Sequence, residues 1–178
     1  MVRRLTSLIF VLVLGSLVAA AQQSTSKFDV FGGYSYFNGS TSGVTNRYSL
    51  NGWNGQGTYY LNHWLGATAD FGGYYGSPFG LSANNYSFLF GPTVRIPVAH
   101  VSPFAHVLFG ADRIYESLLG GSVTDTSFGM ALGGGVDIPV KGGLAVRAGQ
   151  FDWLYSNHFS TGQNNLRVST GVVFRFGQ

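Results

Sequence analysis

The chain has 178 residues, of which 10% are charged and 16% are aromatic, and it contains 27 glycines and no cysteine. Soluble domains usually contain about 25% charged residues, so this composition is unfavourable for a soluble protein that must cover its surface with polar groups. The lack of cysteine excludes a disulfide framework and thiolate metal sites.

Residues 1–21 have the three parts of a secretory signal peptide. Arg3 and Arg4 precede an apolar run from Leu8 to Val18, which small residues follow up to Ala21. The apolar run is shorter than the roughly 20 residues of a membrane-spanning helix, which disfavours the alternative of an N-terminal membrane anchor. We expect cleavage after Ala21, export, and a mature domain of residues 22–178. Without Arg3 and Arg4, its formal charge falls from +3 to +1, so charge gives no argument for nucleic acid as a partner.

The first half of the mature chain contains four segments in which the character of the side chains alternates with period two, as expected of strands. They cover residues 27–37, 48–61, 64–75 and 86–96. In the first segment, Phe28, Val30 and Tyr34 lie on one face, and Asp29 and Ser35 lie on the other. We assign the apolar faces to the outside of a barrel.

The second half repeats this pattern over residues 103–112, 126–138, 144–153 and 165–176. In the seventh segment the alternation becomes ambiguous near Gln150. No apolar stretch of helix-spanning length follows the signal peptide. Segments of about ten alternating residues, in an even number, are typical of membrane β-barrels. The sequence therefore predicts an all-β protein, an eight-stranded antiparallel up-and-down transmembrane β-barrel.

The connections between these segments alternate in length. Residues 61–64, 96–103 and 138–144 form short connections, whereas residues 38–47, 76–85, 113–125 and 156–164 form long polar ones. Outer-membrane barrels combine short periplasmic turns with long external loops. The alternative is a soluble periplasmic lipocalin-like ligand carrier with its apolar face inward, which would require charged residues at the outward positions.

Aromatic residues gather at the segment ends and predict two interfacial girdles, since amphipathic rings favour the headgroup zone. The periplasmic girdle is expected to contain Phe28, Tyr59, Tyr60, Trp64, Phe104, Phe174 and Phe176, and the outer girdle Tyr34, Tyr36, Tyr75, Tyr86, Phe88, Trp153 and Tyr155.

Charged residues in the middle of segments fall on the opposite, inward face. An eight-stranded barrel is just wide enough for side chains to fill it, and isolated charges there would be costly unless paired. We therefore predict a lumen plugged by a charge network of Asp29, Asp70, Arg95, Asp137, Arg147, Arg167 and Arg175. The alternative is a narrow channel for ions or small solutes along the arginines.

We expect no catalytic residue, cofactor or metal, because the four histidines are scattered without metal-ligand spacing. The alternative is an enzyme at the outer rim that uses His158 with Asp152, or Asp112 with Glu116, and no spacing supports it. Binding usually resides on loops of a rigid scaffold. The third and fourth long loops are therefore the candidates for an external ligand, with Tyr115 and His158 as possible contacts.

Three segments, residues 28–36, 61–66 and 171–176, together with the signal peptide, resemble the OmpA-like/OmpX-like family of outer-membrane β-barrel domains. The resemblance implies a Gram-negative-type cell envelope, contact with outer-membrane lipid, insertion by the barrel-assembly machinery, and a structural or surface-interaction role such as anchoring or adhesion. The sequence departs from the family in two respects. No peptidoglycan-binding domain follows the barrel, and Gly177 and Gln178 follow the last aromatic residue, Phe176.

Overall fold

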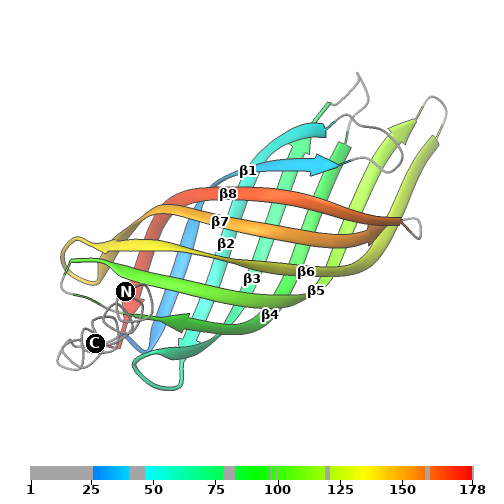
Figure 1. The fold of residues 1–178 in the computed structure, drawn as a ribbon. Coiled ribbons are helices and arrows are strands. Elements are labelled where there is room, and N and C mark those ends of the chain that lie inside the picture. The colour runs from blue at the N-terminus through cyan, green and yellow to red at the C-terminus, as the bar shows by residue number, and fades with distance from the viewer. Residues whose placement is uncertain are drawn as a thin grey trace, which may run out of the picture.

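The computed structural model describes residues 26–40, 47–77, 83–96, 98, 100–118, 121–158 and 161–177. In these ranges the chain forms eight strands, each antiparallel to the next, and pairing of the first with the last closes a barrel (Figure 1). This confirms the predicted fold. The predicted signal peptide, residues 1–21, lies outside the described residues. No helix in the described ranges is long and apolar enough to cross a membrane.

The strands follow the chain in order around the barrel. Their bounds are β1 (Phe28–Ser40), β2 (Arg47–Tyr60), β3 (Leu65–Gly76), β4 (Ala83–Arg95), β5 (Ser102–Leu118), β6 (Gly121–Pro139), β7 (Leu144–His158) and β8 (Thr161–Phe176). The start of β1, the end of β8 and the β2–β3, β4–β5 and β6–β7 connections therefore lie at one end, which is the periplasmic end of such a barrel.

The outer halves of β5 to β8 are longer than predicted. The prediction of a third long loop at residues 113–125 is wrong, because β5 reaches Leu118 and β6 begins at Gly121. The prediction of a fourth at residues 156–164 is wrong for the same reason, because β7 reaches His158 and β8 begins at Thr161. Only residues 119–120 and 159–160 separate these strands, and they lie outside the described residues, as do residues 41–46 and 78–82 of the other two loops. Above the membrane the outward face no longer needs apolar side chains, so a polar sequence there does not imply a loop.

The pleat turns the large apolar side chains outward and the polar ones inward. Tyr34, Phe90 and Phe174 are among many large hydrophobic residues that are about half exposed, whereas Asp70, Asp152 and Arg167 are fully buried. This is the reverse of a soluble barrel. The alternative prediction of a soluble lipocalin-like carrier is therefore wrong, since the outward face of such a carrier would have to be polar.

Two predicted girdle residues, Tyr60 and Phe104, are assigned to the wrong face. Both are buried in the lumen, because their neighbours Tyr59 and Ala105 occupy the outward positions of β2 and β5. The other predicted girdle side chains are exposed or half-buried on the outward face: Phe28, Tyr34, Tyr36, Tyr59, Trp64, Tyr75, Tyr86, Phe88, Trp153, Tyr155, Phe174 and Phe176.

A β-bulge in β7 explains the ambiguous alternation near Gln150. The pairing of β7 with β8 shifts between Arg147 and Gln150, and the pairing with β6 shifts at the same place. An extra residue in one strand moves the following side chains to the other face. Arg147 and Gln150 consequently both point inward, and so do Asp152 and every second residue up to His158.

Candidate functional site

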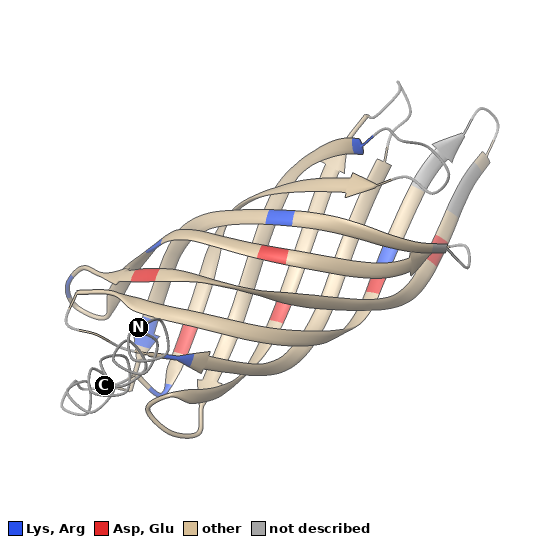
Figure 2. Cartoon of the chain, in the orientation of Figure 1, with Lys and Arg blue, Asp and Glu red and all other residues tan. Residues whose placement is uncertain are grey.

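The lumen holds the charged side chains of the strands in successive layers. Figure 2 shows Asp and Arg residues in the middle of the strands rather than only at their ends. Along β7, the inward residues that follow Ala145 are Arg147, Gln150, Asp152, Leu154, Ser156 and His158. The interior is therefore charged in its periplasmic half, apolar above that, and polar again at the outer mouth.

The periplasmic layer is centred on Asp29. The Arg95 Nη1 donates to Asp29 Oδ2 at 2.8 Å, and its guanidinium lies 3.6 Å from the centre of the Tyr60 ring. Arg175 stands 3.7 Å from both Asp29 and Asp137, a longer ion-pair distance. The misassigned Tyr60 thus forms a cation–π contact inside the lumen.

The next layer is held by Arg147. Its Nε donates to Asp137 Oδ1 at 2.8 Å and its Nη1 to Gln150 Oε1 at 2.6 Å. The guanidinium lies 4.1 Å from the centre of the Phe31 ring and 4.2 Å from that of Phe104. The Phe104 side chain thus points into the lumen, where it stacks on the buried guanidinium of Arg147. The alternation of the sequence alone does not reveal this partner.

Arg167 forms the centre of the network and is fully buried. Its two terminal nitrogens donate to the two oxygens of Asp70 at 2.8 and 3.0 Å, and its Nε donates to Asp152 Oδ2 at 2.7 Å. The Tyr74 hydroxyl lies 3.0 Å from Nη1. One guanidinium of β8 thus joins a carboxylate on β3 to one on β7, with the bidentate geometry of the strongest charge-assisted pairs.

A glycine makes room for the contact between Asp152 and His106. In the register, Gly133 of β6 lies between His106 of β5 and Asp152 of β7. His106 Nε2 and Asp152 Oδ1 are 2.8 Å apart across it. A Cβ at Gly133 would lie 2.0 Å from Asp152 Oδ1 and 2.4 Å from the Phe151 carbonyl oxygen. The missing side chain is therefore required for this polar contact.

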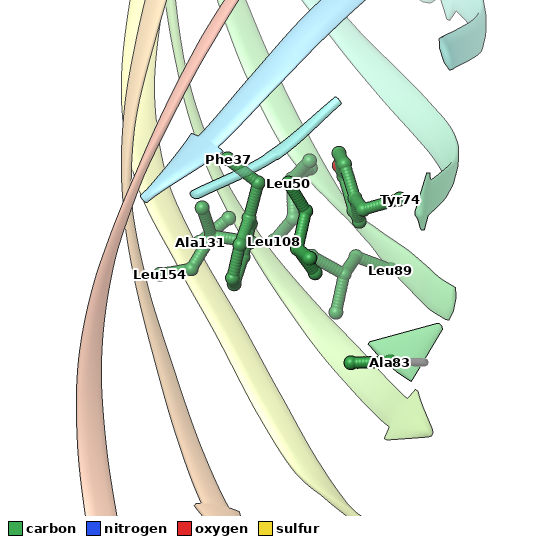
Figure 3. Packing of buried hydrophobic residues seen from close by; sticks show 8 residues of the cluster. All are labelled: Phe37, Leu50, Tyr74, Ala83, Leu89, Leu108, Ala131 and Leu154. Carbon is green, nitrogen blue, oxygen red and sulfur yellow. The ribbon is translucent and has the colours of Figure 1, made fainter. Parts of the chain in front are cut away.

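An apolar layer lies between this network and the outer mouth. Seven of the eight strands contribute to it, and Figure 3 shows the side chains gathered inside the barrel. It consists of Phe37, Leu50, Tyr74, Ala83, Leu89, Leu108, Ala131 and Leu154. This layer was not predicted, because the apolar faces of the segments were assigned to the outside of the barrel.

The outer mouth contains a polar cluster around His158. Its Nδ1 is 3.0 Å from Asp125 Oδ2, its Nε2 is 3.2 Å from Asp112 Oδ1, and the Ser127 hydroxyl lies 3.2 Å from Nδ1. The residue ends β7 beyond Tyr155 of the outer girdle, outside the membrane-spanning part of the strand. Burial lowers the pKa of His158, but hydrogen bonds and charges of the two carboxylates raise it more, so the net shift is upward from 6.5.

This geometry is unsuited to a rim enzyme in which His158 would activate a nucleophile such as the Ser127 hydroxyl. A catalytic histidine needs a free ring nitrogen to accept the proton of the nucleophile. In His158 a carboxylate faces each ring nitrogen, and both nitrogens donate when the ring is a cation. Ser127 therefore adjoins a ring whose two nitrogens each face a carboxylate, so neither nitrogen is free to take the proton of a nucleophile. Among the described residues, no three His, Asp or Glu side chains are grouped as metal ligands.

The structure brings all seven predicted lumen residues together in pairs: Asp29 with Arg95 and Arg175, Asp137 with Arg147 and Arg175, and Asp70 with Arg167. Sequence reasoning missed Asp152 as a network member, because the bulge in β7 conceals its inward phase. The amides of Gln56 and Gln150 were also missed. A polar residue on an inward position of a strand is the signal that could have found the glutamines.

Tyr115 and His158, predicted as contacts on external loops, both lie on strands. Tyr115 is half-buried on the outward face of β5, where its ring contacts Tyr86. His158 is buried at the mouth of the lumen and so cannot contact an external ligand in this conformation. Its position follows from the shifted phase of β7.

Comparison with known proteins identifies the family. The chain is similar in fold to Neisserial surface protein A, with a TM-score of 0.73 and 19% identity over 86% of this chain and 100% of that chain. It is also similar to Ail, the attachment invasion locus protein of Yersinia pestis, with a TM-score of 0.61 and 18% identity over 85% of this chain and 100% of that chain. A third similar structure is the N-terminal β-barrel domain of Pseudomonas aeruginosa OprF, with a TM-score of 0.56 and 12% identity over 85% of this chain and 100% of that chain. No curated protein matches in sequence. Residues 7–176 match the outer membrane protein beta-barrel domain family, and the chain therefore belongs to that family and is a protein of the outer membrane.

Proposed function

We propose that this protein is a closed, non-enzymatic barrel with a structural or surface-interaction role, and that its lumen does not conduct. The observation that carries the proposal is the filling of the interior, where the fully buried Arg167 is paired to carboxylates from two opposite strands. An ion crossing the lumen would have to separate these pairs, and breaking a buried pair costs about 3–5 kcal/mol.

The apolar layer supports the same proposal independently. Hydrophobic constrictions block ion flow because water leaves them. Leu50, Leu89, Leu108 and Leu154 are at most 2% exposed, and their side chains offer an ion no polar group to replace its hydration shell. Two different barriers, one charged and one apolar, therefore stand in series along the lumen.

The outer strand extensions support a role at the cell surface. The β5–β6 hairpin continues beyond Tyr86 and Phe128 with paired strands up to Leu118 and Gly121, which makes it a rigid projection above the membrane. The similar protein Ail is named for attachment and invasion, and Neisserial surface protein A for its place at the surface. We extend an adhesion-like role to this chain on these grounds, and we also propose processing after Ala21 and insertion by the barrel-assembly machinery.

Current recordings in planar bilayers test the closed lumen. We expect no resolved conductance from the folded mature protein. Stepwise conductance in the wild-type protein that changes in an Arg147→Ala variant would instead identify the narrow channel. Heat-dependent gel mobility serves as the control that both proteins are folded.

Adhesion of bacteria that carry the protein tests the surface role. Replacing residues 115–124 with an Asn-Gly turn should abolish added binding to epithelial monolayers, while heat-dependent gel mobility stays unchanged. A matched control replaces Lys141 at the periplasmic end with Gln. Equal adhesion by cells carrying the shortened hairpin would contradict the proposal.

A further inference from the structure

Charge is sorted between the two faces of the barrel. The carboxylates of Asp29, Asp70, Asp112, Asp137 and Asp152 are buried in the lumen, and Asp125 lies at its mouth beside His158. On the outward face of the described strands, in contrast, the charged side chains at the outer end are Arg47 and Arg113, and both are exposed. The surface that meets the outer leaflet is therefore positively charged.

Arg113 projects from β5 beside a row of aromatic rings. Its guanidinium lies 4.8 Å from the centre of the Tyr115 ring. Tyr115 packs edge-on against Tyr86 with ring centres 5.8 Å apart, and Tyr86 packs in the same way against Tyr75 at 5.8 Å. The Trp53 Nε1 donates to the Tyr75 hydroxyl at 3.3 Å. The row thus crosses four neighbouring strands, β2 to β5.

The level of this row in the membrane follows from the register. Arg113 lies directly opposite Tyr86 in the β4–β5 pairing, so the guanidinium stands at the outer aromatic girdle. Tyr and Trp gather at the depth of the lipid headgroups. Arg113 therefore faces headgroups rather than acyl chains or bulk water.

The charge of Arg113 is not neutralised by the described part of the chain. The ion pairs there lie in the lumen or at its mouth, and none of them includes Arg113. Arg47 differs, because its Nη2 donates to the Asn38 carbonyl oxygen at 2.9 Å and its Nε to the Asn38 side chain. Arg47 is held by its neighbouring strand, whereas the Arg113 side chain donates no hydrogen bond to a described residue.

We propose that Arg113, supported by Tyr115 and Tyr86, binds the phosphate group of an outer-leaflet lipid. A planar guanidinium matches phosphate with two parallel hydrogen bonds, and it keeps its stacking contact with an aromatic ring while doing so. The Arg113 guanidinium is exposed and contacts one aromatic ring, and no carboxylate is exposed on the outward face among the side chains that the structure describes; this selects an anionic headgroup. The site thus fixes the barrel to a lipid at one side of its circumference.

Native mass spectrometry of the folded mature protein in detergent tests this proposal, with phosphatidylglycerol as the probe and diacylglycerol as its phosphate-free counterpart. We expect the wild-type protein to retain phosphatidylglycerol in preference to diacylglycerol. Arg113→Gln should weaken retention roughly fivefold, the factor expected for one basic side chain at an anionic membrane surface. Arg113→Lys should recover only part of it, because an ammonium group is a point charge that does not stack.

Arg47→Gln is the matched control, since it removes the same charge from the same face at a residue already held by Asn38. It should retain the lipid like the wild type, and Tyr115→Leu should weaken retention while leaving both arginines in place. Equal losses in Arg47→Gln and Arg113→Gln would overturn the proposal in favour of a diffuse charge effect. Displacement of the lipid by millimolar inorganic phosphate would also overturn it, because the ligand would then be free phosphate.

Discussion

Replacing Arg167 with Met should destabilise the barrel strongly. The substitution keeps most of the side-chain volume but removes the cation that lies within 2.8 Å of Asp70 and 2.7 Å of Asp152. Asp152 would retain His106 and Gln150 as partners. Asp70 would retain the hydrogen bonds that the side-chain amides of Asn54 and Gln56 on β2 donate to it. Removing one member of a buried ion pair costs about 3–5 kcal/mol, and we expect a loss in that range.

The same strand offers a matched control, Arg175→Met. Arg175 lies at the periplasmic mouth, its ion-pair distances are 3.7 Å, and its side chain is 10% exposed against 0% for Arg167. The Nε and Nη2 atoms of Arg175 have no hydrogen-bond partner among the described residues, and Asp29 and Asp137 each keep a closer arginine, so we expect a clearly smaller cost than for Arg167→Met. Adding Asp70→Asn to the Arg167→Met variant should recover part of the loss, because it neutralises one of the two carboxylates left without the cation.

Urea unfolding of the proteins in lipid vesicles, followed by tryptophan fluorescence, measures these differences as changes in the free energy of unfolding. Heat-dependent gel mobility shows whether each variant inserts. If Arg167→Met costs no more than Arg175→Met, then water or a rearranged partner compensates the stranded carboxylates. The account of the lumen as an interior held together by the ion pairs of Arg167 would then be refuted.

Three further predictions concern single positions. In the same urea assay, Gly133→Ala should destabilise the barrel by about 1–3 kcal/mol through overpacking. Gly32→Ala is the control and should be near neutral, because a Cβ there meets nothing within 4 Å. Equal effects of the two substitutions would contradict the conclusion that Gly133 makes room for the contact between Asp152 and His106. Leu108→Ala should cost about 2–5 kcal/mol in that assay without creating conductance. The raised pKa of His158 stabilises the mouth fully below pH 6.5, the ordinary pKa, and this contribution is lost as pH rises through the raised value. His158→Gln should therefore flatten the pH profile of the unfolding midpoint. A profile identical to that of the wild type would contradict the stabilisation of the mouth by the contacts of His158 with Asp112 and Asp125.

The strands that cross the membrane could be predicted because the solvent imposes a period of two on their sequence. In β1, for example, Val30 and Tyr34 must face lipid while Asp29 and Ser35 must not, and the structure has each on the expected face. Lipid tolerates no exposed backbone polar groups, so closure into a barrel follows from the same argument. Fold and location therefore depend on a constraint that acts on every strand.

The outer strand ends could not be predicted, because that constraint stops at the headgroups. Arg113 and Tyr115 continue the alternation of β5 from the headgroup level outward, where a polar outward residue is as acceptable in a strand as in a loop. Hydrogen bonding between the backbones of β5 and β6 decides the outcome, up to Leu118 and Gly121. Pairing of that kind leaves little trace in the composition of a single segment.

The lumen shows a different limit, since its partners come together only when the barrel closes. Arg167 was expected inside, but its joint contact with Asp70 and Asp152 spans strands that are distant in sequence. Asp152 was assigned no place there, because one inserted residue before Gln150 reverses the phase of the rest of β7. A local break in alternation therefore matters as much as the alternation itself, since it changes which side chains enter the interior.

The apolar layer points to a sequence signal that distinguishes closed from open barrels of this size. A conducting lumen needs polar groups at every level, because a permeating ion must exchange its hydration shell for them. In this chain Phe37, Leu50, Leu108 and Leu154 occupy inward positions and pack into one cluster, while charged side chains such as Arg167, Asp70 and Asp152 are buried elsewhere in the lumen. Apolar residues on the inward phase of several consecutive strands thus indicate a barrier that charge patterns alone do not reveal.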